Sequence, residues 1–148
     1  MSLEENKAIV RGLIEAENER NYALLDEFLA PDFVWFESDT PRRGREIYKQ
    51  GLKMTTKAIP DFHGTIEDII AEGDKVWIRE KCTGTHKGEY LGLAPTGKKV
   101  TMTAVAIYRI VDTKVVEMWA VLGMDFFKGL GVIEYTEKGK KLFPEDVK

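Results

Sequence analysis

The spacing of hydrophobic and polar positions changes once along the chain, from a helical period to an alternating one. Up to Ala58, apolar side chains recur every three or four positions, as on one face of a helix. This period predicts helices over residues 3–19 and 44–58, the first opened by a capping box in which Ser2 and Glu5 exchange hydrogen bonds. The N-terminal part is therefore expected to be mainly helical.

A short helix and a strand are expected between these two helices. Asn21 can cap a helix that must end before Pro31, because the residue ahead of a proline is pushed out of the α region. Residues 33–37, Phe-Val-Trp-Phe-Glu, are aromatic and β-branched, which is typical of a strand. A basic loop, residues 41–46, is expected to lead into the next helix.

From residue 62 onward the pattern alternates and predicts a run of strands. Residues 63–86 indicate two strands about a tight turn at Glu72–Asp74, with Ile66, Ile70, Val76 and Ile78 at alternate positions. Residues 99–110 and 114–124 indicate two more, followed by a short helix and an irregular tail. Helices first and an antiparallel meander afterwards predict an α+β fold in which helices cover one face of a curved sheet.

Composition limits the protein to few classes. The chain has 148 residues, 43% hydrophobic and 32% charged, which suits one domain over residues 1–148. Its net charge of −3 is spread out, so neither nucleic acid nor a membrane surface is an expected partner. An acidic N-terminus without an apolar run indicates no signal peptide, and the lone Cys82 suits a reducing compartment, so a cytoplasmic location is expected.

Three segments carry a family resemblance: THKGEYLGLAPTGKKVTMTAVAIYRI (residues 85–110), KVVEMW (114–119) and, upstream, IPDFHGTIEDIIAEGDKVWIR (59–79). Together they resemble the SnoaL-like polyketide cyclase (ester cyclase) family, in the nuclear-transport-factor-like, cystatin-like superfamily. The resemblance runs through residues 5–122. It implies a cone-shaped α+β barrel, with a curved, mixed, mostly antiparallel sheet around the N-terminal helices. The core would span residues 5–124 and a tail residues 125–148, and two copies would pair through the convex face of the sheet.

The resemblance also implies cofactor-free carbon acid chemistry on a small hydrophobic carbonyl compound: aldol-type cyclisation, isomerisation or hydration. Family members commonly place polar residues where this chain has Phe36, Ala106, Met118 and Ala120. Met118 and Ala120 share one face of their strand because side chains two apart point the same way. Either catalysis uses other residues, or the protein binds an apolar small molecule without turning it over.

Three residues remain as candidates for catalysis, each with a simpler structural interpretation. Glu80 continues the parity of the apolar Val76 and Ile78, so its carboxylate would point inward and gain a raised pKa. Alternatively it lies beyond the sheet edge, where it is solvated or paired with Arg109. Asp125 follows the last strand and could reach the pocket mouth or cap a helix. His86 begins a glycine-rich loop, where a structural hydrogen bond is the alternative.

The expected binding residues are the side chains that could line an apolar cavity. Flat rings could stack on a ligand and Tyr108 could donate a hydrogen bond to a carbonyl, although aromatic residues in strands more often serve core packing. No histidines and carboxylates have the spacing of metal ligands, so neither a metal nor a cofactor is expected. The predicted substrate-binding residues are Trp35, Phe36, Trp77, Ala106, Tyr108, Met118 and Ala120.

Overall fold

A six-stranded sheet forms the body of the protein in the computed structural model, which describes residues 1–37 and 39–142. The strand order is β2-β1-β6-β5-β4-β3. β1 and β6 run parallel and all other neighbours antiparallel, which confirms the predicted mixed, mostly antiparallel sheet. The strands are β1 (Leu29–Glu37), β2 (Thr40–Arg43), β3 (His63–Glu72), β4 (Lys75–Thr85), β5 (Lys99–Val111) and β6 (Lys114–Leu122).

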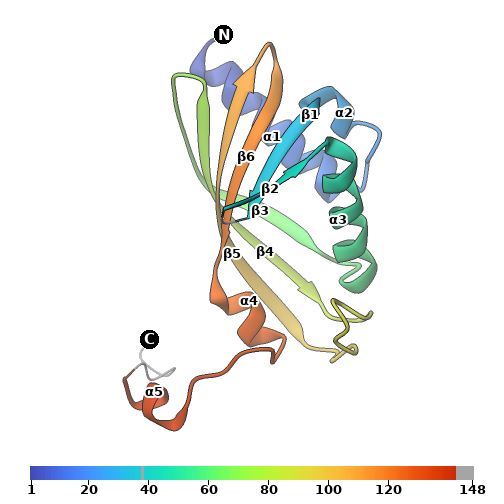
Figure 1. Cartoon of the computed structure of the whole chain (residues 1–148), viewed down its shortest axis with the longest axis vertical. Coiled ribbons are helices and arrows are strands. Elements are labelled where there is room, and N and C mark those ends of the chain that lie inside the picture. The colour runs from blue at the N-terminus through green and yellow to red at the C-terminus, as the bar shows by residue number, and fades with distance from the viewer. Residues whose placement is uncertain (38, 143–148) are drawn as a thin grey trace.

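The N-terminal helices pack on one face of this sheet, as the periodicity predicts (Figure 1). They are α1 (Leu3–Asn18), α2 (Leu25–Phe28) and α3 (Arg45–Ala58). The Ser2–Glu5 capping box of α1 is confirmed. The helices α4 (Met124–Gly129) and α5 (Glu137–Leu142) follow the last strand; α4 packs beside β5, and α5 lies further from the sheet (Figure 1). Among the described residues, no helix is long and apolar enough to cross a membrane.

The core lies between the helices and the face of the sheet that carries Val76, Ile78, Ala106, Tyr108 and Met118, here called the inner face. Alternate residues of β4 and β5 point to it, and α1 contributes an apolar stripe of Val10, Leu13 and Ile14. Each fully buried large apolar side chain contributes about 1.5–3 kcal/mol through removal of its surface from water. The opposite face is called the outer face.

Three local predictions differ from the structure. Residues 40–43 form β2, paired with β1, rather than a loop. β1 begins at Leu29 instead of residue 33, with an irregularity that takes up Pro31. A bulge in β3 after Ile66 reverses the alternation, so Ile70 is exposed rather than inward.

Candidate functional site

Five ionisable side chains from four elements meet on the inner face of the sheet. Glu17 comes from the last turn of α1 and Tyr48 from α3. Glu80 and Cys82 lie on β4, and Tyr108 on β5. Their charges act on one another: Glu80 on Glu17, and both carboxyls on the two tyrosines. We refer to Glu17, Tyr48, Glu80, Cys82 and Tyr108 as the carboxyl cluster.

Glu17 is a neutral acid at the end of α1. The Tyr48 hydroxyl donates a hydrogen bond to its Oε1 at 2.6 Å. Burial raises the pKa of the Glu17 carboxyl to about 8, the charge of Glu80 adds to this rise, and the hydrogen bond from Tyr48 opposes it. The residue as a whole is half-buried, so solvent reaches part of it. At neutral pH most Glu17 side chains therefore hold a proton.

Glu80 points inward from β4, as its parity with Val76 and Ile78 predicts. It is half-buried, and burial raises the pKa of its carboxyl, while a hydrogen bond with the Cys82 thiol opposes the rise. Glu80 is therefore neither solvated beyond the sheet edge nor paired with Arg109. That arginine pairs with Glu117, at 3.5 Å between Nη2 and Oε2.

A glycine on β3 makes room for the Glu80 carboxyl. A side chain at Gly64 would collide with Oε1 of Glu80, and its Cβ would also lie 3.3 Å from Sγ of Cys82. Asn18, next to Glu17, holds this glycine with two hydrogen bonds of 2.8 Å: its Oδ1 accepts from the Gly64 backbone nitrogen, and its Nδ2 donates to the Gly64 carbonyl. The end of α1 and the Glu80 side chain are thus fixed against the same residue.

The two tyrosines remain neutral phenols. Burial raises the pKa of Tyr48 and of Tyr108 well above the usual value, and the charge of Glu17 adds to both rises. Tyr108 is fully buried and lies opposite Met118 of β6. A phenol that stays protonated can donate a hydrogen bond to an oxygen atom that gains negative charge.

Apolar side chains of the inner face and the indole of Trp35 adjoin the carboxyl cluster. Ala106 pairs with Ala120 across β5 and β6, and both point inward, as predicted. Trp35 of β1 pairs with Met118 and packs edge-on against Tyr48, with ring centroids 5.4 Å apart. Its indole Nε1 is buried and has no hydrogen-bond partner among the described residues. Because a buried donor without a partner is costly, Trp35 is suited to a carbonyl oxygen of a ligand.

Phe36 and Trp77, predicted to line the binding site, lie on the outer face. Phe36 stacks on Trp119 with centroids 4.1 Å apart, and Trp77 is 43% exposed. Both are correctly assigned to strands. Side chains alternate between the faces, so neither can share a site with Trp35 or Ile78.

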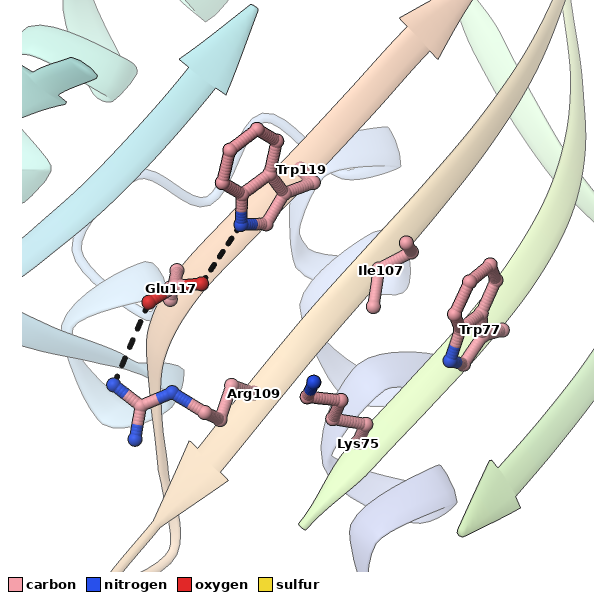
Figure 2. A pocket seen from close by; sticks show the side chains of 6 residues that line it. All are labelled: Lys75, Trp77, Ile107, Arg109, Glu117 and Trp119. Atoms are coloured by element: carbon pink, nitrogen blue, oxygen red, sulfur yellow. Dashed lines mark hydrogen bonds and ion pairs between the residues drawn. The ribbon is translucent and has the colours of Figure 1, made fainter. Parts of the chain in front are cut away.

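A hollow of about 170 Å³ on the outer face lies among six side chains, Lys75, Trp77, Ile107, Arg109, Glu117 and Trp119 (Figure 2). The carboxylate in this hollow, Glu117, already has two partners. Trp119 Nε1 donates a hydrogen bond to one of its oxygens at 2.7 Å, and Arg109 pairs with the other oxygen. Figure 2 shows Glu117 held between these two side chains, away from Trp77 on β4. The carboxylate of this hollow is already paired, whereas the carboxyls of the inner face have no cationic partner among the described residues, so we take the inner face as the candidate site.

Asp125 and His86, the other two predicted catalytic residues, make structural contacts and lie outside the carboxyl cluster. Asp125 accepts hydrogen bonds from the backbone nitrogen and hydroxyl of Thr103 and from the Phe126 nitrogen. His86 is fully buried, and its Nδ1 accepts a hydrogen bond from the Thr96 nitrogen at 3.2 Å, which closes the loop 86–98. Among the described residues, no three His, Cys, Asp or Glu side chains come together to hold a metal.

Glu17 and Tyr48 belong to the site and were missed by sequence reasoning. Both lie on N-terminal helices, where no site residue was predicted. One signal was present: Glu17 follows Leu13 and Ile14 at helical spacing, so it lies beside the apolar stripe of α1. The sequence does not reveal which face of α3 packs against Glu17.

Comparison with known proteins places this chain in a family. Residues 7–124 match the model of the SnoaL-like polyketide cyclases. An aklanonic acid methyl ester cyclase of Streptomyces galilaeus, AcmA, is 25% identical over 117 residues, covering 76% of this chain and 81% of that protein.

Two crystal structures are closely similar. AclR of Streptomyces galilaeus, a candidate hydroxylase, has a TM-score of 0.82 and 33% identity, with 90% of this chain and 100% of AclR covered. IdmH of Streptomyces antibioticus, a candidate polyketide cyclase, has a TM-score of 0.75 and 32% identity, with 86% and 99% covered. The chain belongs to the SnoaL-like polyketide cyclase family.

Proposed function

We propose that the protein is a cofactor-independent enzyme of the cyclase type, which moves protons on a small hydrophobic carbonyl compound with Glu80 as its base. The observation that carries this proposal is an inward carboxyl of raised pKa beside an apolar surface. A carboxylate in such a setting is a stronger base than one in water, so it can remove a proton from a carbon next to a carbonyl. Family membership and the relatives named as cyclases support a cyclase-type reaction.

Glu80 occupies a different strand from the polar residues that the family commonly carries. Those positions are Phe36 on β1, Ala106 on β5, and Met118 and Ala120 on β6, and β5 lies between β6 and β4. Ala120 pairs with Ala106, which pairs with Ile78, and Glu80 is two residues further along β4 on the same face. A substrate over the alanines would therefore meet a base from the β4 side instead of the β6 side.

The chemistry begins with transfer of a C–H proton to Glu80. The resulting enolate oxygen can accept a hydrogen bond from the Trp35 indole or the Tyr108 hydroxyl, which stabilises its charge in a site of low polarity. An enolate formed in this way attacks a second carbonyl of the same molecule in an aldol-type ring closure, or is reprotonated elsewhere in an isomerisation. The relatives include both a candidate hydroxylase and cyclases, so the family alone does not fix the substrate.

Deuterium exchange tests this proposal. The probe is a triketone with a methyl-ketone chain on a cyclohexanedione ring, whose α C–H exchange and ring closure are followed separately by NMR in deuterium oxide. We expect the protein to accelerate exchange and Glu80→Gln to lose about a hundredfold of this acceleration, the usual size of a general-base contribution. Binding is followed in the same samples by tryptophan fluorescence.

The matched control is Glu117→Gln, the same substitution on the outer face, which should leave exchange unchanged. If the triketone binds and its C–H groups exchange no faster than in buffer, the inner face serves binding alone. The apolar residues Ala106, Met118 and Ala120 would then mark a ligand-binding member of the family.

A further inference from the structure

We infer that Glu17 is the general acid of the site, which delivers its proton from Oε2 to the oxygen of the carbonyl that is attacked while Glu80 removes the C–H proton. This inference rests on the proposed function and adds a second catalytic carboxyl, from α1. It also narrows the substrate class: the ligand must hold two carbonyl groups, one activated by the base and one protonated by the acid.

The hydrogen bonds of Glu17 leave one oxygen free for this task. Tyr48 donates to Oε1 at 2.6 Å. Among the described residues, no hydrogen bond reaches Oε2. A protonated carboxyl with one oxygen accepting from a phenol holds its proton on the other oxygen, so Oε2 is the donor atom. Tyr48 itself packs between Phe33 and Trp35, each at 5.4 Å between ring centroids, which fixes the direction of its hydroxyl.

The two carboxyls lie in one neighbourhood, since the charge of Glu80 acts on Glu17. Glu17 precedes Asn18, which binds both backbone polar groups of Gly64, and Gly64 in turn touches the Glu80 carboxyl. Ring closure moves one proton from carbon to Glu80, forms the C–C bond, and moves one proton from Glu17 to the new alkoxide. The enzyme is then left with a protonated Glu80 and an ionised Glu17. Passage of one proton from Glu80 to Glu17 restores the starting state, so no further reactant is needed.

The surroundings of the two carboxyls support this division of roles. Both have raised pKa values, and Glu17 is held at about 8, so it is the protonated partner at pH 7. The charge of one carboxyl hinders ionisation of the other, which favours one shared proton over two charges.

The triketone separates the two roles, because C–H exchange needs the base and ring closure also needs the acid. We expect Glu17→Gln to retain wild-type exchange and to close the ring about a hundredfold more slowly, since an amide can polarise the carbonyl but gives up no proton. Glu15→Gln, on the exposed side of the same helix, is the matched control and should keep both rates.

Tyr48→Phe provides a second test with a pH readout. The hydrogen bond from Tyr48 lowers the pKa of Glu17, so its loss raises that pKa. Ring closure needs protonated Glu17 and should fall above about pH 8 in the wild type, and this fall should move to higher pH in Tyr48→Phe. Circular dichroism serves as the check that each variant is folded.

The possible results are distinguishable. If wild-type protein accelerates neither exchange nor ring closure, the proposed function fails and Glu17 fails with it. Three results would overturn the role of Glu17 alone: wild-type protein that accelerates exchange without ring closure, Glu17→Gln that retains ring closure, and Glu17→Gln that loses both rates. In each case the proposed role of Glu80 is tested separately by Glu80→Gln.

Discussion

The inner and outer faces of the same sheet differ in what their polar groups are free to do. On the outer face, Glu117 is paired with Arg109 and bound by Trp119. On the inner face, Glu80 and Glu17 have no cationic partner within ion-pair distance among the described residues. Unpaired carboxyls in an apolar setting cost stability, and proteins retain them mainly where they do chemistry.

One strand supplies both environments. In β4, Trp77 and Arg79 point outward while Ile78 and Glu80 point inward, because side chains alternate. Arg79 pairs with Glu67 at 3.3 Å on the outer face. Both side chains are exposed there, so solvent screens their charges. A carboxylate and an arginine adjacent in sequence are thus separated by the sheet, which is why Glu80 keeps its raised pKa.

The largest expected effect concerns the pH dependence of stability. The pKa of Glu17 is about 8 in the folded protein against 4.5 for the free group. Its contribution to stability is complete below pH 4.5 and is lost as pH rises through 8, because ionisation favours the unfolded chain. Each pKa unit corresponds to about 1.4 kcal/mol. We therefore expect the free energy of unfolding of Glu17→Gln to exceed that of the wild type by about 3–5 kcal/mol at pH 9 and to be nearly equal to it at pH 5.

Urea unfolding at a series of pH values measures this difference. Glu15→Gln serves as the control, since its exposed carboxylate is replaced without change in burial. The groups that face Glu17, namely Tyr48, Glu80 and Tyr108, remain in both proteins, and the two tyrosines stay neutral over this pH range because their pKa values lie well above the usual value. Parallel pH curves for wild type and Glu17→Gln would show that Glu17 is ionised and solvated.

A smaller effect is expected where the backbone makes room for Glu80. Gly64→Ala places a methyl group on the Glu80 carboxyl and must displace it, while Glu80 itself is still present. We expect a tenfold to hundredfold loss of C–H exchange and a stability loss of about 1–3 kcal/mol from overpacking. Thr65→Ala, an exposed neighbour on β3, is the control. Unchanged exchange in Gly64→Ala would mean that the position of the Glu80 carboxyl is not critical.

The fold could be predicted from the sequence further than the site could. The alternation in residues 99–110 and 114–122 sets one face of each strand, so the inward positions of Ala106, Met118 and Ala120 were correctly predicted. The same rule placed Glu80 inward. Where one residue breaks the period, as in the bulge after Ile66, the sequence carries no sign of it and Ile70 was placed on the wrong face.

The second half of the site depends on contacts between distant segments. Tyr48 and Glu17 are 31 residues apart in sequence, and their hydrogen bond exists only because α1 and α3 pack on the same sheet face. Phe36 was misplaced for a related reason: its aromatic character suits either face, and only its pairing with Trp119 shows which. Helix positions beside an apolar stripe therefore need a structure before a role is assigned.

The smallest effect on chemistry is expected from the outer face, where the homodimer implied by the family resemblance would form. Val121 and its neighbour Val105 across the strands are 70% and 41% exposed, and a second copy would cover them.

Val121→Asp should change the stability of the single chain by no more than about 0.5 kcal/mol, because it replaces a surface side chain. It should leave C–H exchange untouched, since the carboxyl cluster lies on the other face. Sedimentation velocity should show a dimer for wild type and a monomer for Val121→Asp. A wild-type monomer would contradict the dimer, and a loss of exchange in a folded Val121→Asp would mean that the two faces are coupled.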